Sequence, residues 1–444
     1  MVKLRAALVT HYPIIGILLG SLLITAYMAS YTNWDAQIEY EAASSILTHG
    51  FPYISTDHMI NQPPLGFYTS ALFFGVVGLS YLNGVWLATA FGLGSVFLIY
   101  VLGNLMYGRK SGLAAAALFG MVPWHTYMSR IFLIDNQYLF LGLLFLILGI
   151  LAVRRNSQKL VVGAGVVFAV ALLTKLYAVF MLIPMLLIIY LHRKETCFKL
   201  DFKKVMLFVL PSLILHAVWF GGFANQHFAG VYFNTDFTYP EWVTDPVLAF
   251  LPIIFVNSAG WFVFLGGFFA VALGVIYRKK LRAFLQMDMV CLGTIGVIVG
   301  LNLFLVLGLH LKVPYVSAFK YNYSVVPFFC LLAASIVDKS GVLIESICQR
   351  KDRLVALGLG AVGLGLLFAS LIESTLFLNY RWGFVPFGVD SVTYYGLYLF
   401  SEAMDRNLLE MLHFGVLILM ALCMVLPSLI TVLKRLLYSK SWSN

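Results

Sequence analysis

Residues 160–190 read LVVGAGVVFAVALLTKLYAVFMLIPMLLIIY, two apolar runs separated by one charged residue, Lys175. The runs lack the alternating polar residues of a barrel strand, so they predict membrane helices. Because a backbone in lipid must satisfy its own hydrogen bonds, two such runs joined by one residue predict a helical hairpin. The whole 444-residue chain follows this pattern, with 61% hydrophobic and only 11% charged residues. We therefore predict an all-α polytopic membrane protein.

The apolar runs predict about twelve transmembrane helices. The first run resembles a signal peptide, but it is long for one, so we expect an uncleaved first span. Residues 66–79 are apolar but too short for a span, which predicts a juxtamembrane or re-entrant helix on the outer side. The predicted spans lie near residues 11–29, 83–106, 111–128, 135–153, 159–174, 176–192, 205–223, 251–277, 289–309, 321–337, 354–373 and 410–433.

The charged residues predict an orientation. With Met1 in the cytoplasm, 23 of the 29 Lys and Arg residues fall on the cytoplasmic side, which agrees with the positive-inside rule. The formal net charge of +10 therefore reflects topology, and no nucleic-acid partner is predicted. An even number of spans places both termini in the cytoplasm. The cations left on the outer side are Arg130, Lys175, Lys312, Lys320, Arg381 and Arg406.

The first outer loop, residues 30–82, is rich in polar residues. Residues 34–49 predict an amphipathic helix that ends at Gly50. Asp35 and Glu39 are four residues apart and share one face of it. Glu41 is explained equally well by a function or by the preference of a helix N-terminus for an acid on a solvated face. Asp35 directly follows the first span, and we predict that it is functional. Consecutive prolines after Gln62 predict a rigid turn before the short apolar helix.

Charged residues at the outer ends of predicted spans are the other candidates for a site. Asp135 begins one span and Arg130 ends the preceding one, and a simple interfacial ion pair across this hairpin is an alternative explanation. Lys175 and Lys320 occupy positions that the positive-inside rule disfavours, and a bound phosphate would explain them. His125 is expected at an interhelical or interfacial position. His58 could ligate a metal with the acids, although no ligand spacing requires it.

Together these features resemble the GT-C class of membrane glycosyltransferases, which use polyprenyl-phosphate sugars. The nearest relatives in that class are protein O-mannosyltransferases and lipid A aminoarabinose transferases. The resemblance rests on an acid after the first span, a Pro-Pro-Leu-Gly turn, a Ser-Arg followed by Leu-Asp, a Lys at the outer turn after a small-residue helix, and a basic residue followed by Tyr late in the chain. These motifs correspond to Asp35, Gln62–Gly66, Ser129–Arg130 with Ile134–Asp135, Lys175, and Lys320–Tyr321. Ala36 and Gln62 depart from the residues common in the family, which are Glu and His.

The resemblance implies a catalytic transmembrane module over residues 1–204. A more variable module follows over residues 205–444, with outer loops at 224–250 and 374–409. The implied catalytic acids are Asp35, as general base, and Asp135. The implied substrate- and phosphate-binding residues are Arg130, Lys175, Lys320, Tyr321, Glu39 and Gln62. A divalent metal is a candidate cofactor, with Asp35, Asp135 and His58 as candidate ligands.

The implied activity is transfer of a mannose-like sugar, with inversion, from a polyprenyl-phosphate donor to an acceptor hydroxyl at the outer membrane face. The acceptor is a protein, a glycan or a glycolipid. We expect an integral protein of a prokaryotic cell membrane, or of the endoplasmic reticulum if the source is eukaryotic. A non-catalytic subunit of the same fold, a lipid or sugar transporter and an oligosaccharide ligase are the alternatives. A transporter would bury charges in the middle of its spans and show repeated halves.

Overall fold

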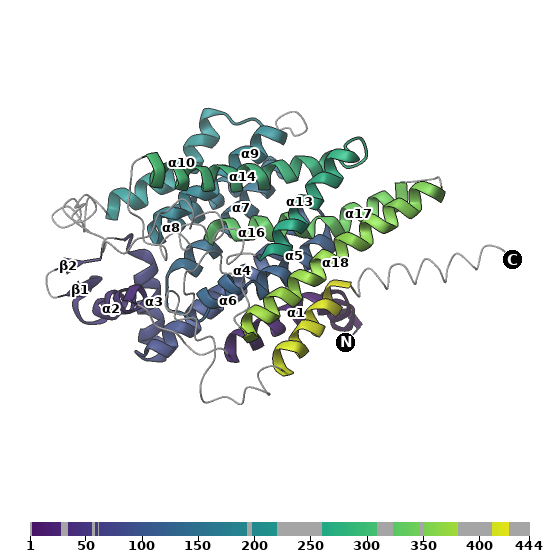
Figure 1. Ribbon diagram of the computed structural model, residues 1–444. Helices are drawn as coiled ribbons and strands as arrows, with labels where there is room; N and C mark the ends of the chain where they lie inside the picture. The colour runs from purple at the N-terminus through teal and green to yellow at the C-terminus, as the bar shows by residue number, and fades with distance from the viewer. Residues whose placement is uncertain are drawn as a thin grey trace.

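A computed structural model describes residues 2–27, 34–55, 58–60, 62–192, 198–219, 260–308, 323–346, 350–380 and 411–425. The described elements are helices, apart from one short antiparallel hairpin (Figure 1). In chain order they are α1 (Val2–Tyr27), α2 (Trp34–His49), β1 (Tyr53–Ser55), β2 (His58–Met59), α3 (Leu65–Val77), α4 (Tyr81–Met106), α5 (Arg109–Met121), α6 (Pro123–Met128), α7 (Asp135–Arg155), α8 (Gln158–Thr174), η1 (Leu176–Met181), α9 (Leu182–His192), α10 (Phe202–Val218), α13 (Trp261–Ile276), α14 (Arg282–Gly308), η4 (Tyr323–Val325), α16 (Val326–Ala334), α17 (Ile336–Ser346), α18 (Arg350–Tyr380) and the helix Met411–Val425.

The helices agree with the predicted helical membrane protein. Each of the twelve predicted ranges overlaps a described helix, and most of them form one elongated bundle (Figure 1). Among the described residues, five helices are long and apolar enough to cross a membrane, and six shorter apolar helices accompany them. The number of crossings and the side of each terminus remain predictions. The five long helices are Tyr81–Met106, Asp135–Arg155, Arg282–Leu301, Tyr323–Glu345 and Leu357–Thr375.

One predicted span is interrupted in the structure. Residues 111–128 form α5 and α6, which are separated at Val122. Proline disfavours a helical conformation in the residue before it, and Val122 accordingly has φ −53° and ψ 124°. Pro123 then occupies the first position of α6, where its missing N–H costs nothing. This break starts the short helix that leads to Ser129 and Arg130.

A small subdomain of α2, β1, β2 and α3 lies at one end of the bundle (Figure 1). The helix α2 has the predicted bounds, and Gly50 ends it with a positive φ of 78°. The helix α3 begins at Leu65, directly after the predicted proline turn, and is 13 residues long. The β1–β2 hairpin was not predicted. Its strands are only three and two residues long, too short to produce a readable alternation.

The inner face of α2 is set by helical spacing. Ala36, Glu39 and Ala43 recur at i, i+3 and i+7 and are all buried. An aromatic cluster holds the subdomain to the bundle, because the ring of Tyr40 contacts Phe74, Tyr81 and Phe132 at centroid distances of 5.7, 5.7 and 6.1 Å. One polar residue, Glu39, is thereby carried on an otherwise apolar buried face.

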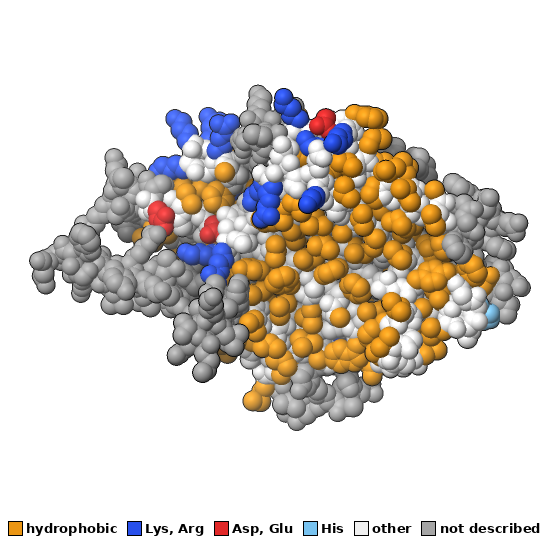
Figure 2. Space-filling view, turned by 180° about the vertical axis from the view of Figure 1, so that it is seen from behind, with side chains coloured by type: hydrophobic (Ala, Val, Ile, Leu, Met, Phe, Trp, Pro, Cys, Tyr) orange, Lys and Arg blue, Asp and Glu red, His pale blue; other side chains and the backbone are white. Residues whose placement is uncertain are grey.

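The surface shows the charge asymmetry that the sequence predicts. A broad hydrophobic face is bordered on one side by Lys and Arg side chains (Figure 2). Ten exposed cations lie in or next to the α4–α5, α7–α8, α9–α10 and α13–α14 turns, all on the predicted cytoplasmic side. Arg130 and Lys175, predicted on the outer side, are each only 5% exposed. The ten are Arg109, Arg154, Arg155, Lys159, Lys199, Lys203, Arg278, Lys279, Lys280 and Arg282.

A buried ion pair joins α13, α14 and α17 inside the bundle. Lys339 Nζ donates to Asp288 Oδ2 at 2.6 Å and to the Ala270 carbonyl at 2.8 Å, and both charged residues are 0% exposed. Desolvating two charges is costly, so the pair is stable only while both partners are present.

Replacing Lys339 by methionine is therefore expected to lower the free energy of unfolding by about 3–5 kcal/mol, because it leaves the Asp288 carboxylate buried without its cation. The double variant K339M/D288L should recover most of that loss. Denaturation in detergent, followed by tryptophan fluorescence, measures both. The exposed Lys279→Met is the control, and equal losses for K279M and K339M would contradict the expectation.

Candidate active site

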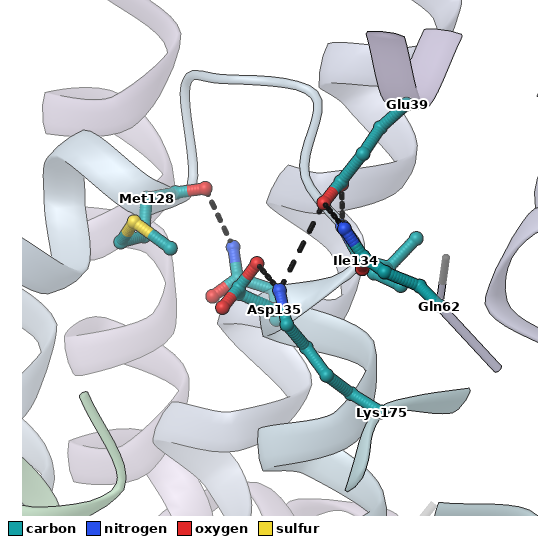
Figure 3. A network of polar contacts seen from close by, with 7 residues as sticks. Glu39, Gln62, Met128, Ile134, Asp135 and Lys175 are labelled. Atoms are coloured by element: carbon teal, nitrogen blue, oxygen red, sulfur yellow. Dashed lines mark hydrogen bonds and ion pairs between the residues drawn. The ribbon is translucent and has the colours of Figure 1, made fainter. Parts of the chain in front are cut away.

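Three ionised side chains meet at the start of α7. Lys175 Nζ donates to Asp135 Oδ2 at 2.5 Å and lies 3.8 Å from Glu39 Oε1 (Figure 3). Asp135 is 0% exposed, Glu39 1% and Lys175 5%. These residues come from α7, α2 and the turn after α8, so the tertiary structure brings together side chains far apart in the sequence.

The local backbone explains how each charge reaches this point. The helix α8 ends at Thr174, and Lys175 adopts an extended conformation with φ −158° and ψ 133° before η1 begins. Because α8 packs along α7, its C-terminal turn lies beside the start of α7. The N-cap of α7 is Ile134, which has no side chain able to cap. Glu39 caps the helix instead, since the Ile134 N–H donates to Glu39 Oε2 at 2.8 Å.

The start of α7 gathers two acids and one lysine. Two carboxylates and one ammonium leave one negative charge unmatched within this triad. The positive end of the α7 dipole lies at Ile134 and Asp135, where it stabilises negative charge. Asp135 Oδ1 is buried and has no hydrogen-bond partner among the described residues. That oxygen can accept a hydrogen bond from a bound hydroxyl group.

Gln62 joins the network weakly, because its Nε2 lies 3.5 Å from Glu39 Oε1. Arg130 does not have the partner that the sequence suggested. Asp135 pairs with Lys175, whereas the Arg130 guanidinium lies over the Trp86 ring, 5.5 Å from its centroid. The alternative explanation, a simple Arg130–Asp135 ion pair across the hairpin, is therefore wrong, because the 129–134 turn directs Arg130 toward α4. Burial lowers the pKa of Arg130, but from a value far above neutrality, so the charge is kept.

Asp35 lies one helical turn before Glu39, in the first turn of α2, and is half-buried. It is more accessible than Asp135, which is 0% exposed. Lys320 and Tyr321, predicted at the phosphate, lie outside the described residues, and so does the side chain of His58. The described residues contain no cluster of three or more His, Cys, Asp and Glu side chains that could hold a metal.

Sequence reasoning missed the residues that hold the start of α7. Asn136 Nδ2 donates to the carbonyls of Met128 and Ala88 at 2.8 and 3.1 Å. Gln137 Nε2 donates to Ser70 Oγ on α3 at 3.0 Å. A signal was present, since three consecutive polar residues, Asp135–Gln137, open an otherwise apolar span. Successive helical positions point in three directions, so each side chain meets a different neighbour.

Comparisons with known proteins confirm the resemblance to GT-C class membrane glycosyltransferases. Residues 61–219 match the family described as dolichyl-phosphate-mannose-protein mannosyltransferase. Asp135 and Lys175 both fall within this range. Two relatives come from Bacillus subtilis (strain 168). The "Putative mannosyltransferase YkcB" is 29% identical over 215 residues, 46% of this chain and 29% of the relative. The "Putative mannosyltransferase YycA" is 26% identical over 204 residues, 44% of this chain and 29% of the relative.

Solved structures share the fold over most of the chain. ArnT from Cupriavidus metallidurans in the apo state superposes with a TM-score of 0.59 at 13% identity, covering 95% of this chain and 75% of that one. ArnT bound to undecaprenyl phosphate gives 0.50 at 14% identity, covering 94% and 78%. The archaeal oligosaccharyltransferase AglB from Archaeoglobus fulgidus, in complex with an inhibitory peptide and a dolichol-phosphate, gives 0.50 at 12%, covering 90% and 61%. The present chain covers less than a third of the length of the two Bacillus relatives.

Proposed function

We propose that this chain transfers a mannose-like monosaccharide, with inversion, from a polyprenyl-phosphate donor to an acceptor hydroxyl at the outer membrane face. The observation that carries the proposal is the buried network of Glu39, Lys175 and Asp135 at the N-terminus of α7. The match of residues 61–219 to a mannosyltransferase family supports the sugar. The polyprenyl phosphates bound to the structural neighbours support a lipid-phosphate donor.

The proposed general base is Asp35. The acceptor oxygen bonds to the anomeric carbon of the sugar while the bond between that carbon and the phosphate oxygen breaks. The acceptor proton passes to Asp35, and polyprenyl phosphate leaves with the electron pair of the broken bond. A single displacement of this kind inverts the anomeric carbon. Asp135 accepts a hydrogen bond from the acceptor or from a sugar hydroxyl through its unpartnered Oδ1.

In this scheme Lys175 binds two anions, the Asp135 carboxylate and the phosphate of the sugar donor. An ammonium group has three N–H donors, and the hydrogen bond to Asp135 Oδ2 uses one of them. Glu39 Oε1, at 3.8 Å, lies beyond hydrogen-bonding distance. The remaining N–H groups of Lys175 are therefore available to bind the phosphate of the sugar donor. Negative charge grows on the phosphate as the sugar departs, so a preorganised cation there lowers the barrier. Arg130, Lys320 and Tyr321 are the further proposed phosphate-binding residues.

The cation distribution supports the proposed orientation. By the positive-inside rule, the ten exposed cations support a cytoplasmic assignment for their end of the bundle, and we propose that the α2–α3 subdomain and the active site face the outside. With twelve crossings, both termini face the cytoplasm. In this arrangement residues 1–204 form the catalytic module. The acceptor is a protein, a glycan or a glycolipid that reaches the site from the outer face or from the lipid.

The test is transfer from labelled polyprenyl-phosphate sugars by the full chain in lipid nanodiscs. Donors carrying mannose, glucose or aminoarabinose are offered with peptide, glycan and lipid acceptors, and labelled product is separated from donor. We expect one donor to be used well above the others, and mannose to be that donor. If mannose fails and another sugar is transferred, the sugar assignment is wrong. If none is transferred while labelled donor crosses liposome membranes, the transporter alternative replaces the proposal.

A further inference from the structure

A second buried polar chain, distinct from the acid–lysine network, reaches the start of α7 from the C-terminal half of the protein. His125 Nδ1 lies 2.6 Å from the Tyr323 hydroxyl, which in turn lies 2.6 Å from Asn136 Oδ1. His125 and Asn136 are 2% and 0% exposed, and Tyr323 is 0% exposed. Tyr323 lies beyond the 61–219 range that matches the mannosyltransferase family. A residue of the variable module therefore touches the residue next to Asp135.

The chemistry of the partners sets the direction of this chain of hydrogen bonds. Asn136 Nδ2 faces two carbonyl oxygens, of Met128 and Ala88, which can only accept, so the amide cannot be flipped. Its Oδ1 therefore faces Tyr323 and needs a donor. Tyr323 has one hydroxyl proton and donates it to Asn136. The remaining contact, between the Tyr323 hydroxyl and His125 Nδ1, takes its direction from the tautomer of the imidazole, whose ring also hydrogen-bonds to the Gly92 backbone.

This chain of hydrogen bonds ends at Asn136, the residue next to the proposed catalytic acid Asp135. Asn136 follows Asp135 in the first turn of α7, and its amide ties that turn to α6 and α4. On the other side, Ser129 Oγ donates to the His125 carbonyl at 2.8 Å, and Thr89 Oγ1 donates to the Ser129 carbonyl at 2.7 Å. Both ends of the 129–134 turn are thus anchored. The direction of the Asp135 carboxylate depends on how rigidly Asn136 is held.

We propose that Tyr323, held between His125 and Asn136, is a positioning residue that aligns Asp135 through Asn136. The inference rests on the proposed function, because it concerns the same acid. Tyr323 touches no reacting atom in this scheme, so it should act on the rate of the chemical step and not on donor binding. A small misplacement of a reacting group is enough to slow catalysis by as much as about 100-fold.

The first test compares Tyr323→Phe with Tyr107→Phe, which removes a buried hydroxyl at the C-terminal end of α4, where its partners are Cys291 Sγ at 3.4 Å and Asp288. We expect Y323F to lower kcat for transfer by about 10- to 100-fold, with the donor KM within about 3-fold of wild type. Y107F should leave both constants unchanged. His125→Phe should lower kcat less than Y323F, because Tyr323 can still donate to Asn136. Unchanged kcat in Y323F, or a loss confined to KM, would overturn the positioning role.

The second test does not depend on activity. The ¹⁵N spectrum of histidine-labelled protein, with His125 assigned by its absence in H125F, reports which ring nitrogen carries the proton. We expect a single tautomer in the wild type, fixed by the contact with Tyr323, and its loss in Y323F. A mixture of tautomers in the wild type, or a spectrum unchanged in Y323F, would overturn the inference. If the tautomer is as expected but the wild type transfers no sugar, the proposed function fails and the positioning role fails with it, while the hydrogen-bond assignment stands.

Discussion

Replacing Asp35 by asparagine is expected to lower the transfer rate by about 10²–10⁴-fold, the usual contribution of a general base. Asparagine keeps the size and hydrogen-bonding capacity of the side chain but cannot take the acceptor proton. Asp35 is half-buried in the first turn of α2 and is not part of the buried apolar face, so the variant should fold normally. The measurement is initial transfer rate in nanodiscs, with the melting temperature recorded on the same preparation.

The matched control is Glu41→Gln, which neutralises an exposed acid on the same helix and should keep wild-type activity. Asp135→Asn belongs in the same series, because it tests the second acid. If D35N keeps most of the wild-type rate and D135N loses it, the base is Asp135 and the assignment of Asp35 is wrong. If D35N and E41Q behave alike, neither acid on α2 takes part in the chemistry.

Replacing Lys175 by methionine is expected to have the largest combined effect on stability and activity. It leaves the buried carboxylates of Asp135 and Glu39 without their cation, at a cost of about 3–5 kcal/mol in the free energy of unfolding. Transfer should fall as well, because the donor phosphate loses a positive charge. Denaturation in detergent measures the first effect, and transfer by the protein that remains folded measures the second.

The double variant K175M/D135N separates the two roles of this lysine. Removing the negative charge of Asp135 relieves the buried imbalance, so stability should recover in part while transfer stays absent. Lys159→Met, at an exposed position at the start of α8, is the control for loss of a lysine. Recovery of transfer along with stability would mean that Lys175 serves only as a counter-ion. Equal stability of K175M and K159M would contradict the buried network itself.

Much of the fold could be predicted from the sequence because its signals are local. Apolar runs predict helices in a membrane, and the exposed cations of the α4–α5, α7–α8, α9–α10 and α13–α14 turns reproduce the predicted charge asymmetry. The bounds of α2 follow from helical spacing and from Gly50. The break at Val122 was equally readable from Pro123, since a proline restricts the residue before it. The β1–β2 hairpin carries no such signal.

The candidate site was predicted only in part. The sequence by itself determined that Asp135 and Lys175 stand at the ends of apolar spans, because a charge in such a position is costly enough to be conspicuous. It offered an ion pair between Arg130 and Asp135 as an alternative explanation, since those residues are close in the chain. The structure instead pairs Asp135 with Lys175, 40 residues away, because α8 packs along α7 while the 129–134 turn directs Arg130 to Trp86.

The tertiary structure likewise decided that Glu39 caps α7 and that Tyr323 is a partner of Asn136. Hydropathy and spacing describe each helix by itself, and they carry no information about which distant helix lies beside it. The composition of the chain therefore determined a helical membrane protein with charges gathered at the ends of its spans. Only the packing of α2, α4, α7, α8 and η4 decided which charges and hydroxyls meet, because a hydrogen bond or ion pair forms over a few ångströms and depends on the position of both partners.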